Sequence, residues 1–278
     1  MTFFEFTPVV FVISGVAGFL GALTGLGGGV VVTPALTLLL GVDLRYAMGA
    51  TLISVIATSS GAASAYVREG YSNLRIGMFL EVATTIGAVA GAYLSSRIPT
   101  SVLAIIFGVV LLHAAWQSMR RRPADSAGAV SDPLAVKLRM EGSYPGPQGP
   151  QHYNVRRVKT GFGIMFGAGT LSGLLGIGSG ALKVIAMDQA MRIPFKVSTT
   201  TSNFMIGVTA AASAGVYLSR GYIEPNLAMA VMLGVLAGSV LGARELIGAR
   251  PALLRWIFAG LVGAMAVEMI FSGVTGRI

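Results

Sequence analysis

Two glycine-rich segments, 25–29 and 176–180, each lie between a long apolar run and a short one. Irregular backbone inside a membrane survives only where protein buries it or water lines it. Broken helices at matching positions of two halves mark transporter binding sites, and the amides that begin the next helix attract anions. We therefore predict an anion site here; ordinary tight turns are the alternative. The predicted ligands are Gly27, Gly28, Gly29, Gly178, Ser179 and Gly180.

Lys183 lies three residues after the second glycine cluster, in a short apolar segment. An ionisable side chain inside a membrane segment is a functional-site candidate. Its ammonium group could neutralise an anion held at the neighbouring cluster, and this is the role we predict. Two alternatives stay open: the side chain could reach the membrane interface, or it could pair with Asp188 on the same segment.

A run of six polar residues, 198–203, follows Pro194 at the start of a long apolar stretch. Hydroxyl groups and a helix N-terminus together can coordinate an oxyanion. The alternative is that these side chains cap the helix and bond to neighbouring helices. We predict substrate contacts from Thr200, Thr201, Ser202 and Asn203, and from Thr51 in the first half, which aligns with Ser202.

Glu81 lies deep in an apolar stretch and needs either a partner or a proton. A buried carboxyl group can carry the proton of a coupled transporter. A salt bridge to Arg75 or to another helix is the competing interpretation. We keep Glu81 as the candidate for proton coupling.

The composition requires an environment other than water for these residues. The chain has 278 residues, 54% of them hydrophobic and 11% charged, with a mean hydropathy of +0.76. Soluble proteins carry roughly 25% charged residues. The chain is therefore predicted to be an integral membrane protein. The absence of cysteine excludes thiolate chemistry, and a chain with only two histidines is not expected to form a histidine-rich metal centre.

Long apolar runs recur at lengths near the ~20 residues that a membrane-spanning helix needs. Two shorter runs, 30–40 and 181–191, follow the glycine clusters and are predicted to be half-helices or re-entrant segments. The predicted long spans are 8–25, 47–67, 75–96, 100–118, 160–177, 197–218, 225–243 and 251–272.

The two halves align without a gap when the chain is shifted by 151 residues, which places Gly25 on Gly176. Tyr66 and Gly70 then meet Tyr217 and Gly221. The matches fall at turns and at small-residue helix faces, where backbones approach closely. The sequence therefore predicts a duplicated membrane unit.

Charge distribution predicts how the two copies are oriented. Residues 119–159 hold eight basic and three acidic residues, as expected for a cytoplasmic loop rather than a nucleic-acid groove. If the short segments also cross, each half has five spans and the second half is inverted. We predict an all-α, five-plus-five inverted repeat with both termini outside. Its parts are a first repeat (1–118), a solvated basic linker (119–159) and a second repeat (160–278). Within the linker, residues 144–150 are expected to lack regular structure.

With these features together, the chain resembles the sulfite exporter TauE/SafE family of membrane transport proteins. The similarity rests on Gly25-Leu26-Gly27-Gly28-Gly29 with Pro34 downstream, on Ala50-Thr51, on Gly70-Tyr71 and on the cluster 176–180. Ile185, where a second proline would repeat Pro34, departs from the pattern, as does the long basic loop. The resemblance implies transport of sulfite or of sulfonates such as sulfoacetate across a bacterial cytoplasmic membrane.

The predicted function is therefore secondary transport of a small sulfur-containing anion by alternating access, driven by a proton, another ion or the substrate gradient. No ATP-binding loop motif is present, and no cofactor, metal or nucleic acid is expected. A channel would instead show a charged ring or filter motif. An intramembrane hydrolase using Ser179 would need His113 as its base, and Gly178-Ser179-Gly180 lacks the usual spacing around a nucleophilic serine.

Overall fold

The computed structural model describes residues 3–24, 29–68, 71–119, 131–146, 149–178, 180–245 and 251–278, and it is mostly helical. The expected helix positions are confirmed within a few residues, and the two short apolar segments are helical as well. The elements are α1 Phe3–Thr24, α2 Gly29–Leu40, α3 Leu44–Arg68, α4 Leu74–Ser95, α5 Thr100–Met119, α6 Pro133–Lys137, β1 Gly142–Gly146, β2 Gly149–Tyr153, α7 Val158–Leu175, α8 Gly180–Ile185, the π-helix η1 Ala186–Ala190, α9 Phe195–Ser219, α10 Pro225–Glu245 and α11 Pro251–Val274.

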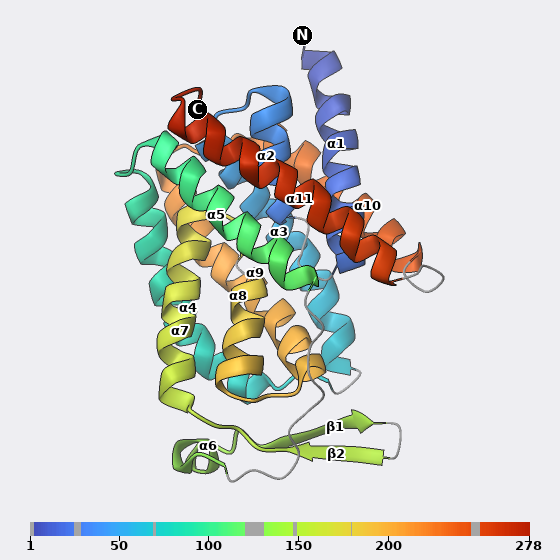
Figure 1. Cartoon of the computed structure of the whole chain (residues 1–278), viewed down its shortest axis with the longest axis vertical. Coiled ribbons are helices and arrows are strands. Elements are labelled where there is room, and N and C mark those ends of the chain that lie inside the picture. The colour runs from blue at the N-terminus through green and yellow to red at the C-terminus, as the bar shows by residue number, and fades with distance from the viewer. Residues whose placement is uncertain are drawn as a thin grey trace.

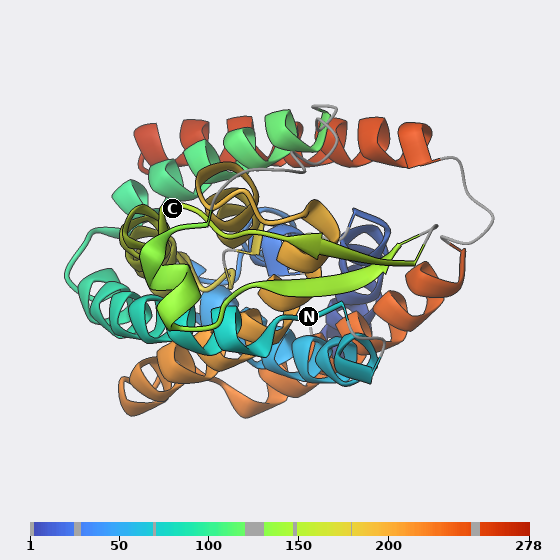
Figure 2. The same ribbon diagram turned by 90° about the horizontal axis from the view of Figure 1, so that it is seen from below.

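The long helices pack in pairs that join distant parts of the chain. Helix α1 packs on α10, α4 packs on α7, and α3 packs on α9. Helices α5 and α11 lie side by side along one flank of the bundle (Figures 1 and 2). Helices α8 and η1 contact α9 and α7, so the short segment after the second glycine cluster is enclosed by longer helices.

Helix α4 carries its large apolar side chains on the outside. Met78, Val82 and Ile86 lie one turn apart and are 59%, 55% and 57% exposed, whereas Glu81 and Thr84 are buried. This is the reverse of a soluble protein and matches a helix whose outer face contacts lipid. Among the described residues, Leu74–Ser95 and Pro225–Gly242 are long and apolar enough to cross a membrane, and shorter apolar helices accompany them at 6–21, 29–40, 100–116 and 259–274.

Glycines allow the closest helix contacts. A Cβ atom added to Gly87 of α4 would lie 2.9 Å from the amide nitrogen of Thr170 on α7. A Cβ atom on Gly238 of α10 would lie 2.9 Å from the amide nitrogen of Phe19 on α1. Gly87 and Gly238 are equivalent under the 151-residue shift, as are Phe19 and Thr170. The α4–α7 contact and the α10–α1 contact are therefore equivalent under the internal repeat.

Equivalent helices also run in opposite directions. In Figure 1, α1 descends from the upper end of the molecule, whereas α7 rises from the lower end. Helices α3 and α9 are opposed in the same way. The N-terminal end of α1 and the C-terminus both lie at the upper end, and the β1–β2 hairpin lies at the lower end (Figure 1).

The expectation that residues 144–150 lack regular structure was wrong. Strands β1 and β2 form an antiparallel hairpin in which Pro145 lies opposite Pro150 and Gly146 opposite Gly149. Antiparallel ladders alternate hydrogen-bonded and non-hydrogen-bonded pairs, and prolines facing each other fit a non-hydrogen-bonded pair, where neither needs an N–H group. Proline therefore does not prevent this short ladder, although the remainder of the turn lies outside the described residues.

Asn73, which caps helix α4, attaches the hairpin to the bundle. Its side-chain nitrogen donates to the carbonyl of Met140 at 2.9 Å and to the hydroxyl of Tyr153 at 2.7 Å. Its side-chain oxygen accepts from the amide of Ile76 at 3.1 Å. Because burial raises the pKa of Tyr153, against a smaller lowering by the Asn73 hydrogen bond, the phenol stays neutral and accepts from Asn73. The segment after residue 131 is thus docked on the bundle rather than fully solvated.

Candidate functional site

The second glycine cluster interrupts the chain between α7 and α8. Gly176 ends α7 in the left-handed conformation, with φ of 67°, and its amide donates to Ser172. Gly178 is also left-handed, with φ of 72°, and α8 begins at Gly180. Residues with a side chain rarely adopt these backbone angles, so glycine at both positions allows the chain to leave the helix here. The break places Lys183 in the first turn of α8.

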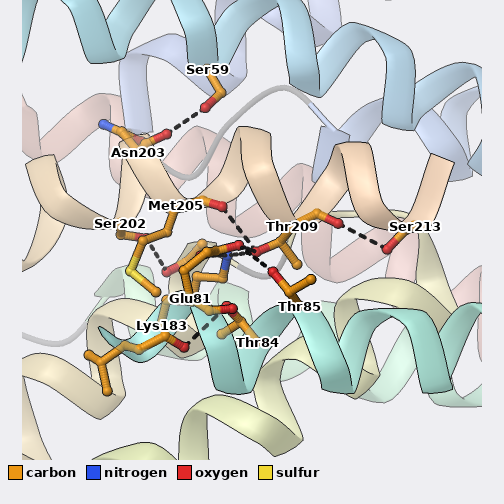
Figure 3. Close-up of polar contacts among 12 residues, drawn as sticks. Ser59, Glu81, Thr84, Thr85, Lys183, Ser202, Asn203, Met205, Thr209 and Ser213 are labelled. Carbon is orange, nitrogen blue, oxygen red and sulfur yellow. Dashed lines mark hydrogen bonds and ion pairs between the residues drawn. The ribbon is translucent and has the colours of Figure 1, made fainter. Parts of the chain in front are cut away.

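Lys183 is completely buried and lies among other helices. Its ammonium nitrogen donates to the hydroxyl of Thr209 on α9 at 2.5 Å and lies 3.9 Å from Oε2 of Glu81 on α4. Figure 3 shows these side chains meeting between α4, α8 and α9. The side chain therefore does not reach the membrane interface, and its ion-pair partner is Glu81 instead of Asp188.

Glu81 uses its two carboxylate oxygens differently. Oε1 accepts from Thr209 at 2.6 Å and from Thr85 at 3.3 Å. Oε2 faces Lys183 and has no hydrogen-bond partner among the described residues, although it is buried. Arg75, the partner considered from the sequence, donates to the carbonyl of Arg139 at 3.2 Å. The alternative of an ion pair with another helix is the arrangement found.

Thr209 connects the two charges and was not predicted from the sequence. Its hydroxyl accepts from Lys183, donates to Glu81 and lies 3.0 Å from the carbonyl of Met205. The sequence did contain a signal, because Thr209 aligns with Thr58 under the internal repeat, so both halves have a threonine hydroxyl at this position. Thr85, one turn after Glu81, is the second residue that was missed.

The two glycine breaks approach each other inside the bundle. A Cβ atom on Gly29, where α2 begins, would lie 3.7 Å from the carbonyl oxygen of Ile177 and 2.7 Å from Val55 on α3. A Cβ atom on Gly178 would lie 3.1 Å from Val55 as well. Gly29, the described end of the first break, therefore lies close to the second break, and Val55 contacts both. Gly27, Gly28 and Ser179 lie outside the described residues.

Two of the predicted hydroxyl groups lie next to the breaks. Ser202 donates to the carbonyl of Gly180 at 3.2 Å and is buried. Thr51 accepts from Thr33 of α2 at 2.9 Å, and its methyl carbon lies 3.0 Å from a Cβ atom placed on Gly29. These equivalent residues occupy equivalent places, one beside each break.

The remaining members of the hydroxyl run serve other contacts. Thr200 donates to the carbonyl of Tyr71 at 3.0 Å, and Thr201 accepts from the amide of Asn73 at 3.0 Å. The carbonyl of Asn203 accepts from Ser59 of α3 (Figure 3). Thr200 and Thr201 thus attach α9 to the segment before α4, and the structure does not bring them together with Lys183.

The buried charges of the site are one ammonium group and one carboxylate group. No group of three or more potential metal-binding His, Cys, Asp or Glu side chains occurs among the described residues. His113, the base that a hydrolase would need, is exposed on α5, and its ring lies beside Trp116. Lys183, Glu81 and Thr209 can instead hold an ion or a proton between helices.

A helical bundle with apolar outer faces and a buried ion pair beside a broken helix is typical of integral membrane transporters. Comparison with known proteins supports that class. A profile described as "Sulfite exporter TauE/SafE" matches residues 10–269, and the chain belongs to this family. The resemblance noted from the sequence is thereby confirmed.

Curated relatives point to the same class of protein. The probable membrane transporter protein YunE of Bacillus subtilis (strain 168) is 27% identical over 243 residues, which cover 84% of this chain and 87% of the relative. A probable membrane transporter protein of Methanocaldococcus jannaschii is 24% identical over 284 residues, covering 96% and 97%. No solved structure matches significantly. The chain is a multi-pass membrane protein of a transporter family.

Proposed function

We propose that the chain is a secondary transporter that moves a small sulfur-containing anion, such as sulfite or a sulfonate, across the bacterial cytoplasmic membrane by alternating access. The family description supports the substrate class, because it names sulfite. The observation that carries the proposal is the ammonium group of Lys183, completely buried in the first turn of α8, directly after the break in the helix.

The proposed anion site lies at the two breaks. Lys183 supplies the positive charge, and Ser202 and Thr51 supply hydroxyl groups next to the breaks. The backbone amides of the glycine segments around Gly29 and Gly180 are the further proposed donors. Thr200, Thr201 and Asn203 contribute through the position of α9. Gly27, Gly28, Gly178 and Ser179 complete the proposed set.

The proposed movement is a rocking of two inverted five-span halves, 1–118 and 160–278. The opposite directions of α1 and α7 support the inversion, as does the exchange of contacts between α4–α7 and α10–α1 (Figure 1). Inverted repeats with broken helices can exchange two conformations around a site at their interface. The glycine-lined contacts supply smooth surfaces for such a movement.

The hairpin end of the bundle is the proposed cytoplasmic side, with both termini outside. Basic residues support this orientation, because Arg75, Arg139, Arg157 and Lys196 lie in or beside segments at that end. The positive-inside rule assigns such an end to the cytoplasm. Since no ATP-binding motif is present, the proposed energy source is an ion gradient or the substrate gradient.

Counterflow in liposomes tests this proposal. Liposomes containing the full chain are loaded with unlabelled sulfite, sulfoacetate, taurine or thiosulfate, and uptake of the labelled form is measured with and without a pH gradient. We expect exchange of at least one anion. Lys183→Ala should slow it by at least about tenfold, because a charge-assisted hydrogen bond is lost.

Lys196→Ala is the matched control, since Lys196 is exposed on α9 and should leave exchange close to wild type. Unchanged exchange in Lys183→Ala would show that Lys183 does not bind the anion. Absence of exchange for every anion would exclude the proposed transport function.

A further inference from the structure

The buried charges of the site balance without a ligand. Lys183 contributes one positive charge and Glu81 one negative charge, 3.9 Å apart. The site is enclosed, since Lys183 is 0% exposed and the Glu81 side chain 9%. Burying an uncompensated charge is strongly unfavourable, so a conformation that encloses the site must keep its net charge close to zero.

An anion at Lys183 would upset this balance. With Glu81 still ionised, the loaded site would hold one positive and two negative charges. Other ionisable groups on these helices are placed differently: Arg75 of α4, Lys159 of α7 and Lys196 of α9 are exposed near their helix starts, and Asp188 of η1 is half-buried. Neutralising Glu81 is the direct way to restore the balance.

Building on the proposed function, we propose that each anion is carried as a monoanion together with one proton on Glu81, so that transport is electroneutral. The exchange is balanced: the Lys183–Glu81 ion pair plus A⁻ plus H⁺ gives a Lys183–A⁻ ion pair plus neutral Glu81. The proton forms an O–H bond on the carboxyl group, and Lys183 keeps its own proton throughout.

The hydrogen bonds of the site fit this exchange. Oε2 of Glu81 has no hydrogen-bond partner among the described residues, so it is free to take the proton. Oε1 keeps its bonds from Thr209 and Thr85, which hold the carboxyl group in place in either state. Within the described residues, the ammonium of Lys183 donates only to Thr209, which leaves two of its three donors for an oxyanion.

The arrangement also separates substrates by charge. A monoanion such as hydrogen sulfite or methanesulfonate gives a neutral loaded site. A dianion such as sulfoacetate would leave one uncompensated negative charge in the closed bundle. We therefore expect monoanions to move without charge transfer and dianions to move more slowly.

The test uses liposomes containing the wild-type chain, with labelled methanesulfonate and sulfite as probes and the membrane potential set by potassium and valinomycin. A pH difference of about one unit, alkaline inside, should accumulate a monoanion about tenfold, since one-to-one coupling transfers the tenfold proton ratio to the anion. A potential of about 60 mV at equal pH should change accumulation little, whereas uncoupled anion movement would follow it about tenfold.

Glu81→Gln fixes this side chain in its neutral form, so the anion-loaded site stays neutral whereas the empty site keeps the charge of Lys183. It should keep anion counterflow but lose accumulation driven by the pH gradient. Glu268→Gln, an exposed glutamate on α11, is the matched control and should retain both. The wild-type measurements decide the question even if Glu81→Gln fails to fold.

Loss of proton coupling and loss of transport give different results in these liposomes. Anion flux in the wild-type protein that ignores the pH gradient, or that follows the membrane potential at equal pH, overturns electroneutral coupling and leaves the transport function standing. Absence of flux for every probe overturns both. Proton-driven accumulation that persists in Glu81→Gln excludes Glu81 as the carrier.

Discussion

Replacing single glycines on helix α7 tests whether the α4–α7 contact is as close as the structure indicates. A Cβ atom on Gly173 would lie 2.7 Å from the carbonyl carbon and 2.9 Å from the Cα atom of Ala88 on α4, and would overlap the carbonyl oxygen. Carbon atoms pack at about 3.5–4.0 Å, so Gly173→Ala must push the two backbones apart by roughly 1 Å. Gly167, on the same helix, has nothing within 4 Å of an added Cβ atom.

The two substitutions should therefore have opposite signs. Overpacking costs about 1–3 kcal/mol, and alanine gains about 1 kcal/mol over glycine as a helix former. Gly173→Ala should lower stability and Gly167→Ala should leave it equal or slightly higher. The helix-propensity gain is common to both variants, so the difference is the overpacking cost of roughly 1–3 kcal/mol. Thermal unfolding in detergent measures both variants under identical conditions.

Transport gives a second measure of the same displacement. Helix α4 carries Glu81, so separating α4 from α7 shifts the carboxyl group relative to Lys183 and should slow anion exchange in Gly173→Ala. Gly167→Ala should exchange at the wild-type rate. Equal unfolding temperatures for the two variants would show that the helices are not in backbone contact, and the reasoning from close packing would be refuted.

Two further predictions concern the hairpin. Asn73→Ala removes the hydrogen bonds to Met140 and Tyr153 together with the helix cap, so it should lower stability by about 1–3 kcal/mol. Limited proteolysis should then cleave the hairpin faster, whereas Asn226→Ala, the control at an exposed asparagine, should leave cleavage unchanged. Because burial raises the pKa of Tyr153, its contribution to stability should be complete below about pH 10 and be lost as the pH rises through the folded-state pKa. Tyr153→Phe should therefore flatten the alkaline loss of stability, and an unchanged alkaline profile would contradict this.

Helix positions could be predicted because the apolar residues of the chain occur in runs of nearly the same length. Each run is bounded by glycine, proline or charged residues, as between Ser95 and Thr100, where Arg97 and Pro99 separate α4 from α5. The two short segments were also recognisable, since glycine clusters precede them. Such boundaries depend on local sequence, which periodicity and composition report directly.

The hairpin was missed because proline and glycine density was taken as evidence against any ladder. Pro145 and Pro150 are compatible with strands only because they face each other, and that register follows from pairing across the turn. Docking depends further on Asn73, some 70 residues earlier in the chain. Neither the register nor the docking partner is encoded within the segment itself.

The partners of the charged residues could not be read from spacing. Asp188 and Arg75 were the candidates for Lys183 and Glu81 because they are charged and lie only five and six residues away in the sequence. The actual partners lie on different helices, and Thr209 between them is one of many hydroxyl groups in the apolar stretches. Only the packing of α4, α8 and α9 selects these three side chains.

The glycines of the site are repeated in both halves, whereas its charged residues are not, and this difference bears on the mechanism. The glycines recur in both halves, but Lys183 aligns with Val32 and Glu81 with Met232, so the ion pair occurs once. Glu81 belongs to the first half and Lys183 to the second. If the halves rock against each other, the distance between these charges is a quantity that the movement can change. An anion and a proton that replace the ion pair would then act on the contact between the halves, which links what is bound to the conformation adopted.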